Sequence, residues 1–472
     1  MNTWAHMLDW MASDAKSFLN LALEHGGSGD VFAEATERIF LHSHRHGRSP
    51  AQTTISRDHI EGIALYVTDG QSTGFASRAG LSTREFTPLA EHARLPAGSR
   101  TIPAIHAITT PHKHPITPPD ALPLLAEAEL KALATAAMDA AFSQDPAVHS
   151  CTVVLQGKLR RTIILTSEGF LVPQLQAWAG LKVSVGRRQG DQSSEGEAMS
   201  GGPFGAGHFF KDLPEEVSRR AVAQAIRLKD AQPLKLERGD AVLAGAWGGV
   251  FLHEAIGHAL EADIGYGQVG DQVGLQDVTL LDDPTFADGR ASASHDDEGF
   301  PATPTLLIQD GLLAGHLTDR HTAAATQTQR TGNGRRQDYR FRPLPRMTNL
   351  VMPPGTAAEE DLIAQVEDGL YIVQPGVGIF QPHSAHFLLS AREAYRIKKG
   401  RLAAPVTGIS ICGDSSKPLA GLAGIGSTQE HDASRGVCVK AGQVLPVSTA
   451  MPSVRLNGMN FIPTPDIKST CS

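Results

Sequence analysis

The tightest constraint on the structure of this chain is a short segment, residues 248–261, that holds two histidines and a glutamate. His253 and His258 are five residues apart, and Glu254 directly follows the first. A regular α-helix would leave the two imidazoles about 140° apart around its axis. A π-type turn, closed by i to i+5 hydrogen bonds, brings such residues onto one face. The segment is therefore predicted to contain a π-type turn near Gly257, because glycine tolerates such a distortion.

These three side chains have the chemistry of a catalytic metal site. Imidazoles are common zinc ligands, and zinc peptidases place a glutamate where it can activate a water molecule. With His253 and His258 on one face, Glu254 would lie between them, in the position of a general base. A chance grouping of structural or solvated residues is the alternative, because the familiar motif separates its histidines by four residues.

A catalytic zinc ion commonly has three protein ligands, so a third donor must come from elsewhere in the chain. Cys438 is our candidate, because the neighbouring Gly436, Gly442 and Pro446 indicate a structured loop that could present a thiolate. A thiolate is a strong zinc ligand, and binding would deprotonate the thiol. The alternative is that Cys438 is simply a small buried hydrophobic residue.

Length and composition indicate an ordinary globular protein with more than one core. A chain of 472 residues favours two domains, and we place the boundary near Asp230, between residues 1–230 and 231–472. Apolar residues make up 41% and charged residues 19%, which is sufficient for hydrophobic cores. The net charge of -8 argues against nucleic acid or an anionic membrane as a partner.

We expect a soluble, cytoplasmic protein with no membrane part. The sequence has no apolar run long enough to span a bilayer, and Asp9 and Asp14 interrupt the N-terminus where an export signal would be apolar. The cysteines are scattered and form no C-x-x-C pair, which suits a reducing compartment. They are Cys151, Cys412, Cys438 and Cys471.

The first half is expected to combine helices with short strands. Helices are predicted at 4–23, 122–142 and 214–228, and strands at 60–67 and 73–77. Residues 151–155 and 161–166 are predicted to form a hairpin around a turn at 156–160, and the polar residues 189–207 a loop. In the second half, apolar runs such as 305–308 and 370–373 indicate a mixed or antiparallel sheet.

Two other motifs are assigned a structural role and no function. His42, His44 and His46 would face one way in a strand, but no carboxylate supports a metal site there, and a solvated loop is favoured. The glycine-rich stretch 421–426 lacks the lysine of a phosphate-binding loop. We interpret it as a turn within a sheet.

Several segments beyond 253–258 carry a resemblance to a known family. They are Asp297–Gly299, Leu307–Gly311, Gly332–Arg336, Pro345–Asn349, Ser390–Tyr395 and Cys438–Val447. In this order, between about Ser167 and Pro463, they resemble the TldD/PmbA family of metallopeptidases, and in particular its TldD-like branch, which keeps the metal site.

The resemblance implies an α+β fold, with an N-terminal α/β domain and a β-rich C-terminal domain that carries the metal-ligand helix. It implies hydrolysis of peptide bonds with a Zn2+ ion held by His253, His258 and Cys438. Glu254 would be the catalytic base, taking a proton from water and passing it to the leaving amine. The family also implies a dimer, either a homodimer or a heterodimer with a TldE/PmbA-like subunit.

The chain departs from the family pattern at positions that bear on its substrate. Val439 follows Cys438 where the family usually has glycine, and the region before Pro146, including the proline-rich stretch 111–119, matches weakly. His383 and His386 could line a substrate pocket or be exposed loop residues. We expect a zinc metallopeptidase that acts on unfolded or extended peptides and could process a small modified peptide. The alternatives are a zinc-dependent amidase or deacylase in small-molecule biosynthesis, and a non-catalytic partner subunit.

Overall fold

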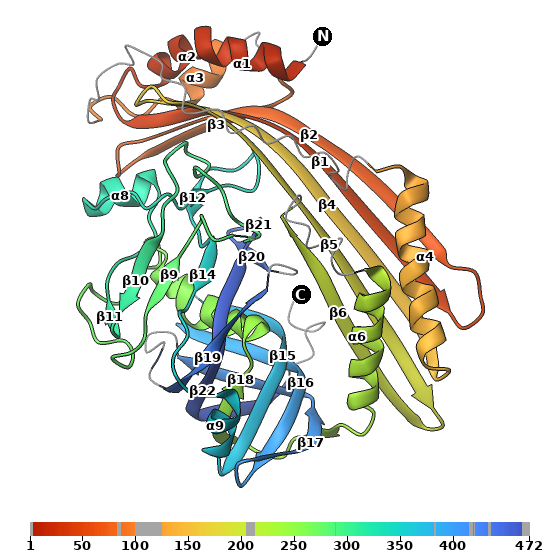
Figure 1. The fold of residues 1–472 in the computed structure, drawn as a ribbon. Helices are drawn as coiled ribbons and strands as arrows, with labels where there is room; N and C mark the ends of the chain where they lie inside the picture. Colours follow the sequence, from red (N-terminus) through yellow and green to blue (C-terminus); the bar gives the residue numbers. More distant parts are fainter. Residues whose placement is uncertain are drawn as a thin grey trace.

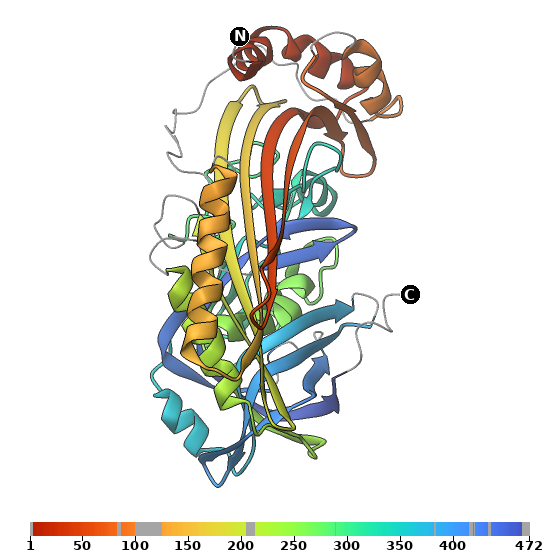
Figure 2. The same ribbon diagram turned by 90° about the vertical axis from the view of Figure 1, so that its right-hand side faces the viewer.

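The computed structural model of the chain describes residues 3–82, 86–99, 125–203, 213–287, 289–381, 384–414, 419, 421–432 and 436–464. The proline-rich stretch 111–119 and His383 lie outside the described residues. A long curved sheet forms one side of the molecule, and the C-terminal half packs against its inner face (Figures 1 and 2). No described helix combines the length and apolar character needed to cross a membrane.

The first sheet has six strands in the order β3-β2-β1-β4-β5-β6, and each pair is antiparallel. The strands are β1 (Ser28–His46), β2 (Gln52–Thr68), β3 (Thr73–Ala79), β4 (Val148–Thr166), β5 (Leu171–Gln189) and β6 (Gln192–Pro203). The helices of this half are α1 (Thr3–Ser13), α2 (Ala15–Ala22), α3 (Phe86–Ala93), α4 (Glu127–Gln144) and α6 (Pro214–Arg227).

Both faces of this sheet are covered, and the alternation of side chains in β1 shows how. Val31, Ala33 and Leu41 point to the outer face, where they pack against the helices in two clusters. Phe32 points to the inner face and packs against Tyr339 of the C-terminal half. Helices on one face of an antiparallel sheet, followed by a β-rich half, confirm the predicted α+β class.

Three local predictions in the first half are wrong. Residues 156–160 do not turn but continue β4, because β1 and β5 pair with them on both sides. The segment expected as a polar loop contains β6, whose Gly196 lets α6 approach closely: an added Cβ there would lie 2.0 Å from the Ala221 carbonyl oxygen. His42, His44 and His46 lie in β1 rather than in a loop.

The C-terminal half is built on a mixed sheet of 12 strands, in which β22 pairs with four neighbours. Its longer strands are β8 (Arg238–Leu243), β10 (Thr305–Gln309), β15 (Asp368–Gln381), β16 (His386–Lys398), β17 (Arg401–Thr407), β18 (Ile409–Asp414), β19 (Leu422–Asp432) and β22 (Ser448–Pro463). The shorter strands of the sheet are β7 (Gln232–Pro233), β9 (Leu280–Asp282), β11 (Leu312–Leu313) and β14 (Asn349–Val351).

Two small hairpins and several short helices complete this half. The hairpins are β12 (Gly334–Arg335) with β13 (Leu344–Pro345), and β20 (Val437–Lys440) with β21 (Gln443–Pro446). The helices are η2 (Ala246–Gly248), α7 (Gly249–Phe251), η3 (Leu252–Gly257), η4 (His258–Leu260), α8 (Arg320–Thr326) and α9 (Glu359–Ala364). The predicted turn at 421–426 is wrong, since residues 422–426 lie in β19.

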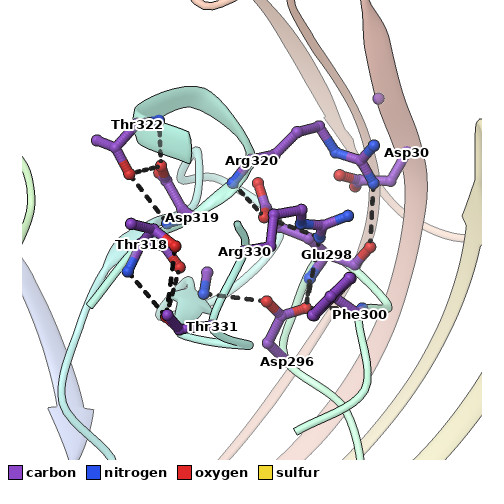
Figure 3. Close-up of polar contacts among 12 residues, drawn as sticks. Asp30, Asp296, Glu298, Phe300, Thr318, Asp319, Arg320, Thr322, Arg330 and Thr331 are labelled. Carbon is purple, nitrogen blue, oxygen red and sulfur yellow. Dashed lines mark hydrogen bonds and ion pairs between the residues drawn. The ribbon is translucent and has the colours of Figure 1, made fainter. Parts of the chain in front are cut away.

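Buried ion pairs hold the two halves together. Arg160 of β4 contacts Glu34 of β1 at 3.1 Å and Asp297 of the C-terminal half at 2.7 Å. Asp30 of β1 pairs with the fully buried Arg336 at 2.8 Å. Figure 3 shows the neighbouring contacts, where Glu298 binds Arg330 and the backbone of Arg320. Buried charges require such partners, so these pairs specify how the halves dock.

The change from one sheet to the other falls between α6 and β7. Helix α6 packs on the outer face of the first sheet, whereas β7 pairs with β17 of the second. The boundary near Asp230 stays a prediction.

Candidate metal centre

The two histidines lie on a distorted helical segment in the core of the C-terminal half. Residues 252–257 form a π-helix, and the backbone N–H of His258 donates to the carbonyl of His253, five residues earlier. The two imidazole rings therefore come onto one side, with their centroids 4.8 Å apart. The predicted π-type turn is confirmed.

Gly257 is required for space rather than for backbone freedom. Its φ of -59° is ordinary for a helix. A Cβ added there would lie 2.1 Å from the sulfur of Met347 and 2.9 Å from Leu350. The neighbouring Leu252 and Ile256 are fully buried in the main core. Tight packing of these residues thus holds the distorted helix against the main core.

Cys438 reaches the histidines from the hairpin of β20 and β21. Its Sγ lies 3.3 Å from Nε2 of His258, although 180 residues separate them in the chain. One ligand atom from each of His253, His258 and Cys438 lies within 4.8 Å of the others, and all three residues are buried. The structure therefore brings together the three residues that the sequence singled out.

The donor set fits a zinc ion. Tetrahedral zinc with ordinary bond lengths separates a nitrogen from a sulfur ligand by about 3.6 Å, close to the separation of His258 and Cys438. Nε2 of His253 is buried and has no hydrogen-bond partner among the described residues. Three protein donors also leave one position for water or substrate.

The electrostatics of the cluster favour a thiolate. Burial by itself would raise the pKa of the Cys438 thiol, but the charges of His253 and His258 and the hydrogen bond with His258 outweigh it and hold the pKa well below its usual value. A thiol with a lowered pKa binds metal without the cost of deprotonation.

Glu261 is a functional candidate that the sequence reasoning missed. Its Oε2 lies 2.9 Å from Nδ1 of His258 and 2.8 Å from the ammonium of Lys440, two residues after Cys438. Burial raises the pKa of Glu261, but His258 and Lys440 outweigh it and lower the pKa to about 2. As a carboxylate, Glu261 accepts the Nδ1 proton and leaves Nε2 free as a ligand. The sequence offered one signal for this role: Glu261 comes three residues after the candidate ligand His258, a spacing that places the two side chains on the same side of a helix.

We expect Glu261→Gln to lower zinc affinity about 10- to 100-fold, the usual effect of losing a carboxylate behind a ligating histidine. The affinity is measured by competition with a chelator of known strength. Asp263→Asn is the matched control, because Asp263 contacts Lys440 at 2.6 Å, whereas the carboxylate at Nδ1 of His258 is that of Glu261. Equal zinc affinity in the wild type and Glu261→Gln would contradict a role for Glu261 in orienting His258.

Glu254 lies half-buried beside the cluster, against strand β15. A Cβ added to Gly378 would come within 2.5 Å of its Cγ and 2.9 Å of its Oε1. Burial raises the pKa of Glu254, although His253 and His258 oppose the shift. Phe380, on the same strand, stacks on His258 with ring centroids 5.4 Å apart. A carboxylate with a raised pKa next to three donors is typical of a general base.

Three polar residues of the family-like segments, Arg335, Arg336 and Asn349, have structural contacts. Arg335 donates to the backbone carbonyls of Met347 and Pro446. Arg336 binds Asp30, and the side chain of Asn349 bonds to the backbone of Asp283 and to Ser292 and Ser448. His386 is exposed. Within the part of the chain that the structure describes, His253, His258 and Cys438 form the one group of three residues with metal-binding geometry.

Two domain models of one metallopeptidase family match this chain. Residues 117–229 match the PmbA/TldA metallopeptidase central domain, and residues 237–463 match the C-terminal domain of the same family. A Haemophilus influenzae protein named metalloprotease TldD homolog is 33% identical over 329 residues, covering 67% of this chain and 68% of that protein. A Saccharolobus solfataricus protein named zinc metalloprotease TldD homolog is 28% identical over 59% of this chain and 63% of that protein.

Solved structures share the fold at low sequence identity. A Thermotoga maritima protein, described as a candidate modulator of a DNA gyrase, superposes with a TM-score of 0.72 at 21% identity, covering 95% of this chain and 99% of that one. TldE from Thermococcus kodakarensis superposes with a TM-score of 0.69 at 16% identity over the same shares. These likenesses concern the fold alone.

Proposed function

This chain belongs to the PmbA/TldD family of metallopeptidases, and we propose that it is a zinc-dependent peptidase that hydrolyses amide bonds of unfolded or extended peptides. One observation carries the proposal: two imidazoles and a thiol with a lowered pKa converge beside the half-buried carboxylate of Glu254. This combination supplies both a metal site and a base within one cluster.

Each residue of the cluster has a separate task. When bound, zinc would supply a Lewis acid for the scissile carbonyl and for a water molecule. His253, His258 and Cys438 would hold the ion, and Glu261 would keep His258 in the tautomer that binds through Nε2. Glu254 would take the proton of the attacking water and deliver it to the leaving amine. Phe380 would shield one side of His258 from solvent.

The substrate, assembly and location form part of the proposal. We assign extended or unfolded peptides as the substrate class, including a small modified peptide. The protein would act in the cytoplasm as a homodimer or as a heterodimer with a TldE/PmbA-like subunit. Family membership supports these assignments.

The proposal is tested by metal removal. We expect the purified protein to contain about one zinc ion per chain by mass spectrometry, and to lose peptide cleavage when a chelator removes it. Zinc should restore cleavage, and His258→Ala should lack both zinc and activity. Cleavage at full rate without metal would contradict the proposal. A zinc-loaded protein that hydrolyses small amides but not peptides would favour the amidase alternative instead.

A further inference from the structure

Two adjoining cavities lie between the inner face of the first sheet and the C-terminal half. Their volumes are about 190 Å³ and 460 Å³, and they share five lining residues. The shared residues are Lys158, Trp178, Arg290, Leu445 and Pro446. The lining that the structure describes does not include the candidate metal ligands, so we treat the two cavities as one compartment separate from the metal centre.

Two hydrogen-bond donors in this compartment have no acceptor in the part of the chain that the structure describes. Lys158 of β4 and Trp178 of β5 are directly opposite each other in the sheet, so their side chains lie together on the inner face. The indole Nε1 of Trp178 is buried without a hydrogen-bond partner among the described residues. No described residue forms a hydrogen bond or ion pair with the Lys158 ammonium. The buried indole N–H without an acceptor is costly, and a ligand with acceptor oxygens would satisfy it together with the half-buried ammonium of Lys158.

The charge of the compartment is positive in a chain whose net charge is -8. Arg290 lies over the Trp178 ring, with its Cζ 4.2 Å from the ring centroid. Arg160 is already engaged, because its single positive charge is shared between Glu34 and Asp297. In all, the lining contains Arg38, Lys158, Arg160, Arg290 and Arg335 against Asp58, Asp296 and Asp297. The excess of cations favours an anionic ligand.

The pKa of Lys158 is consistent with a missing counter-ion. Burial and the neighbouring charges of Arg160 and Arg38 together lower its pKa to about 7, against the opposing effect of Glu34 and Asp297. An anion bound beside the ammonium would favour its charged form.

The compartment is close to the candidate metal ligand on β20. Leu445 of β21, which lines both cavities, is directly opposite Cys438 in the hairpin. Cross-strand neighbours have Cβ atoms about 5 Å apart. An extended peptide advances about 3.3 Å per residue, so a group in the compartment would lie within a few residues of a bond cleaved at the metal.

We infer that Lys158, Trp178 and Arg290 form a subsite for a carboxylate of the peptide substrate, close to the scissile bond. This inference rests on the proposed function and specifies the substrate as an acidic or carboxyl-terminal peptide segment. The ammonium and guanidinium supply charge, and the indole N–H supplies a further hydrogen bond. The carboxylate has two sources, the free C-terminus of the peptide or an Asp or Glu side chain.

Binding is measured by isothermal titration calorimetry on the zinc-loaded full chain carrying Glu254→Gln, so that peptides are not consumed. The probes are N-acetylated hexa-alanine with a free carboxylate, its C-terminal amide, and amides with a single Glu or Gln at each position. We expect the carboxylate-bearing peptide to bind about tenfold or more tightly than its neutral isostere, as for a charge-assisted hydrogen bond. Tighter binding of the free acid than of its amide would identify the peptide C-terminus as the source of the carboxylate. Tighter binding of a Glu peptide than of its Gln counterpart would identify an acidic side chain.

Lysine variants identify the subsite. In the Glu254→Gln background, Lys158→Gln should make the affinities for the carboxylate-bearing peptide and its neutral isostere about equal. Lys158→Arg keeps the positive charge and should retain the preference for the carboxylate. The matched control is Lys131→Gln, the same change at an exposed lysine of α4 that pairs with Glu127, which should leave the preference unchanged. In the active protein, which keeps Glu254, the preference for the carboxylate-bearing peptide should appear mainly as a lower KM.

Two outcomes overturn the inference: equal affinity for acid and isostere, including no measurable binding of either, or a preference that Lys158→Gln does not change. Failure of the proposed function gives a different result. A protein that binds acidic peptides through Lys158 but cleaves none would retain the subsite and contradict the peptidase assignment alone.

Discussion

Replacing Glu254 with glutamine is expected to lower kcat for peptide hydrolysis by about 10²- to 10⁴-fold while zinc remains bound. Glutamine keeps the size of the side chain but cannot accept a proton from water. Gly378 leaves room for a side chain of this size, because a Cβ there would come within 2.5 Å of Cγ and 2.9 Å of Oε1 of Glu254. Initial rates and zinc content of the same preparation measure the two effects separately.

The control for this change is Glu360→Gln, on the exposed side of α9. It makes the same chemical substitution away from the cluster and should leave the rate unchanged. A Glu254→Gln protein that cleaves peptides at the full rate would show that another group is the base. Loss of zinc together with activity would show that Glu254 mainly supports the metal site.

Replacing Cys438 with serine is expected to remove zinc and activity together. A serine hydroxyl stays protonated near neutral pH and is a poor zinc ligand, whereas the histidines favour a thiolate at this position. We expect zinc affinity to fall by more than about 100-fold, beyond the effect of losing a contact behind a ligand. Chelator competition measures the affinity, and the melting temperature shows whether the fold is retained.

Cys412→Ser is the matched control, because Cys412 lies in β18 and its Sγ lies 3.9 Å from the carbonyl of Asn460. It should keep both zinc and activity. If Cys438→Ser bound zinc as tightly as the wild type, the third ligand would have to be another residue. A folded Cys438→Ser protein without zinc would support the proposed ligand set.

Local sequence arguments failed where the structure depends on distant strands. Gly157 and the polar residues around it are typical of a turn, yet the backbone of residues 156–160 pairs with β1 on one side and β5 on the other. The polar side chains at Lys158 and Arg160 face the C-terminal half rather than solvent. A long-range sheet outweighed the local preference, because each paired residue gains ladder hydrogen bonds and packing.

Within the candidate site, some features follow from the local sequence and others depend on contacts between distant segments. The sequence by itself determined the π-type turn, because two imidazoles five residues apart share one face only in such a turn. It also marked Cys438 as a donor without showing that its Sγ lies 3.3 Å from His258. Only the tertiary structure decided the contact of Glu261 with Lys440 and the pairing of Lys158 with Trp178. The first contact joins residues 179 apart in the chain, and the second depends on the register between β4 and β5, so neither follows from local sequence preference.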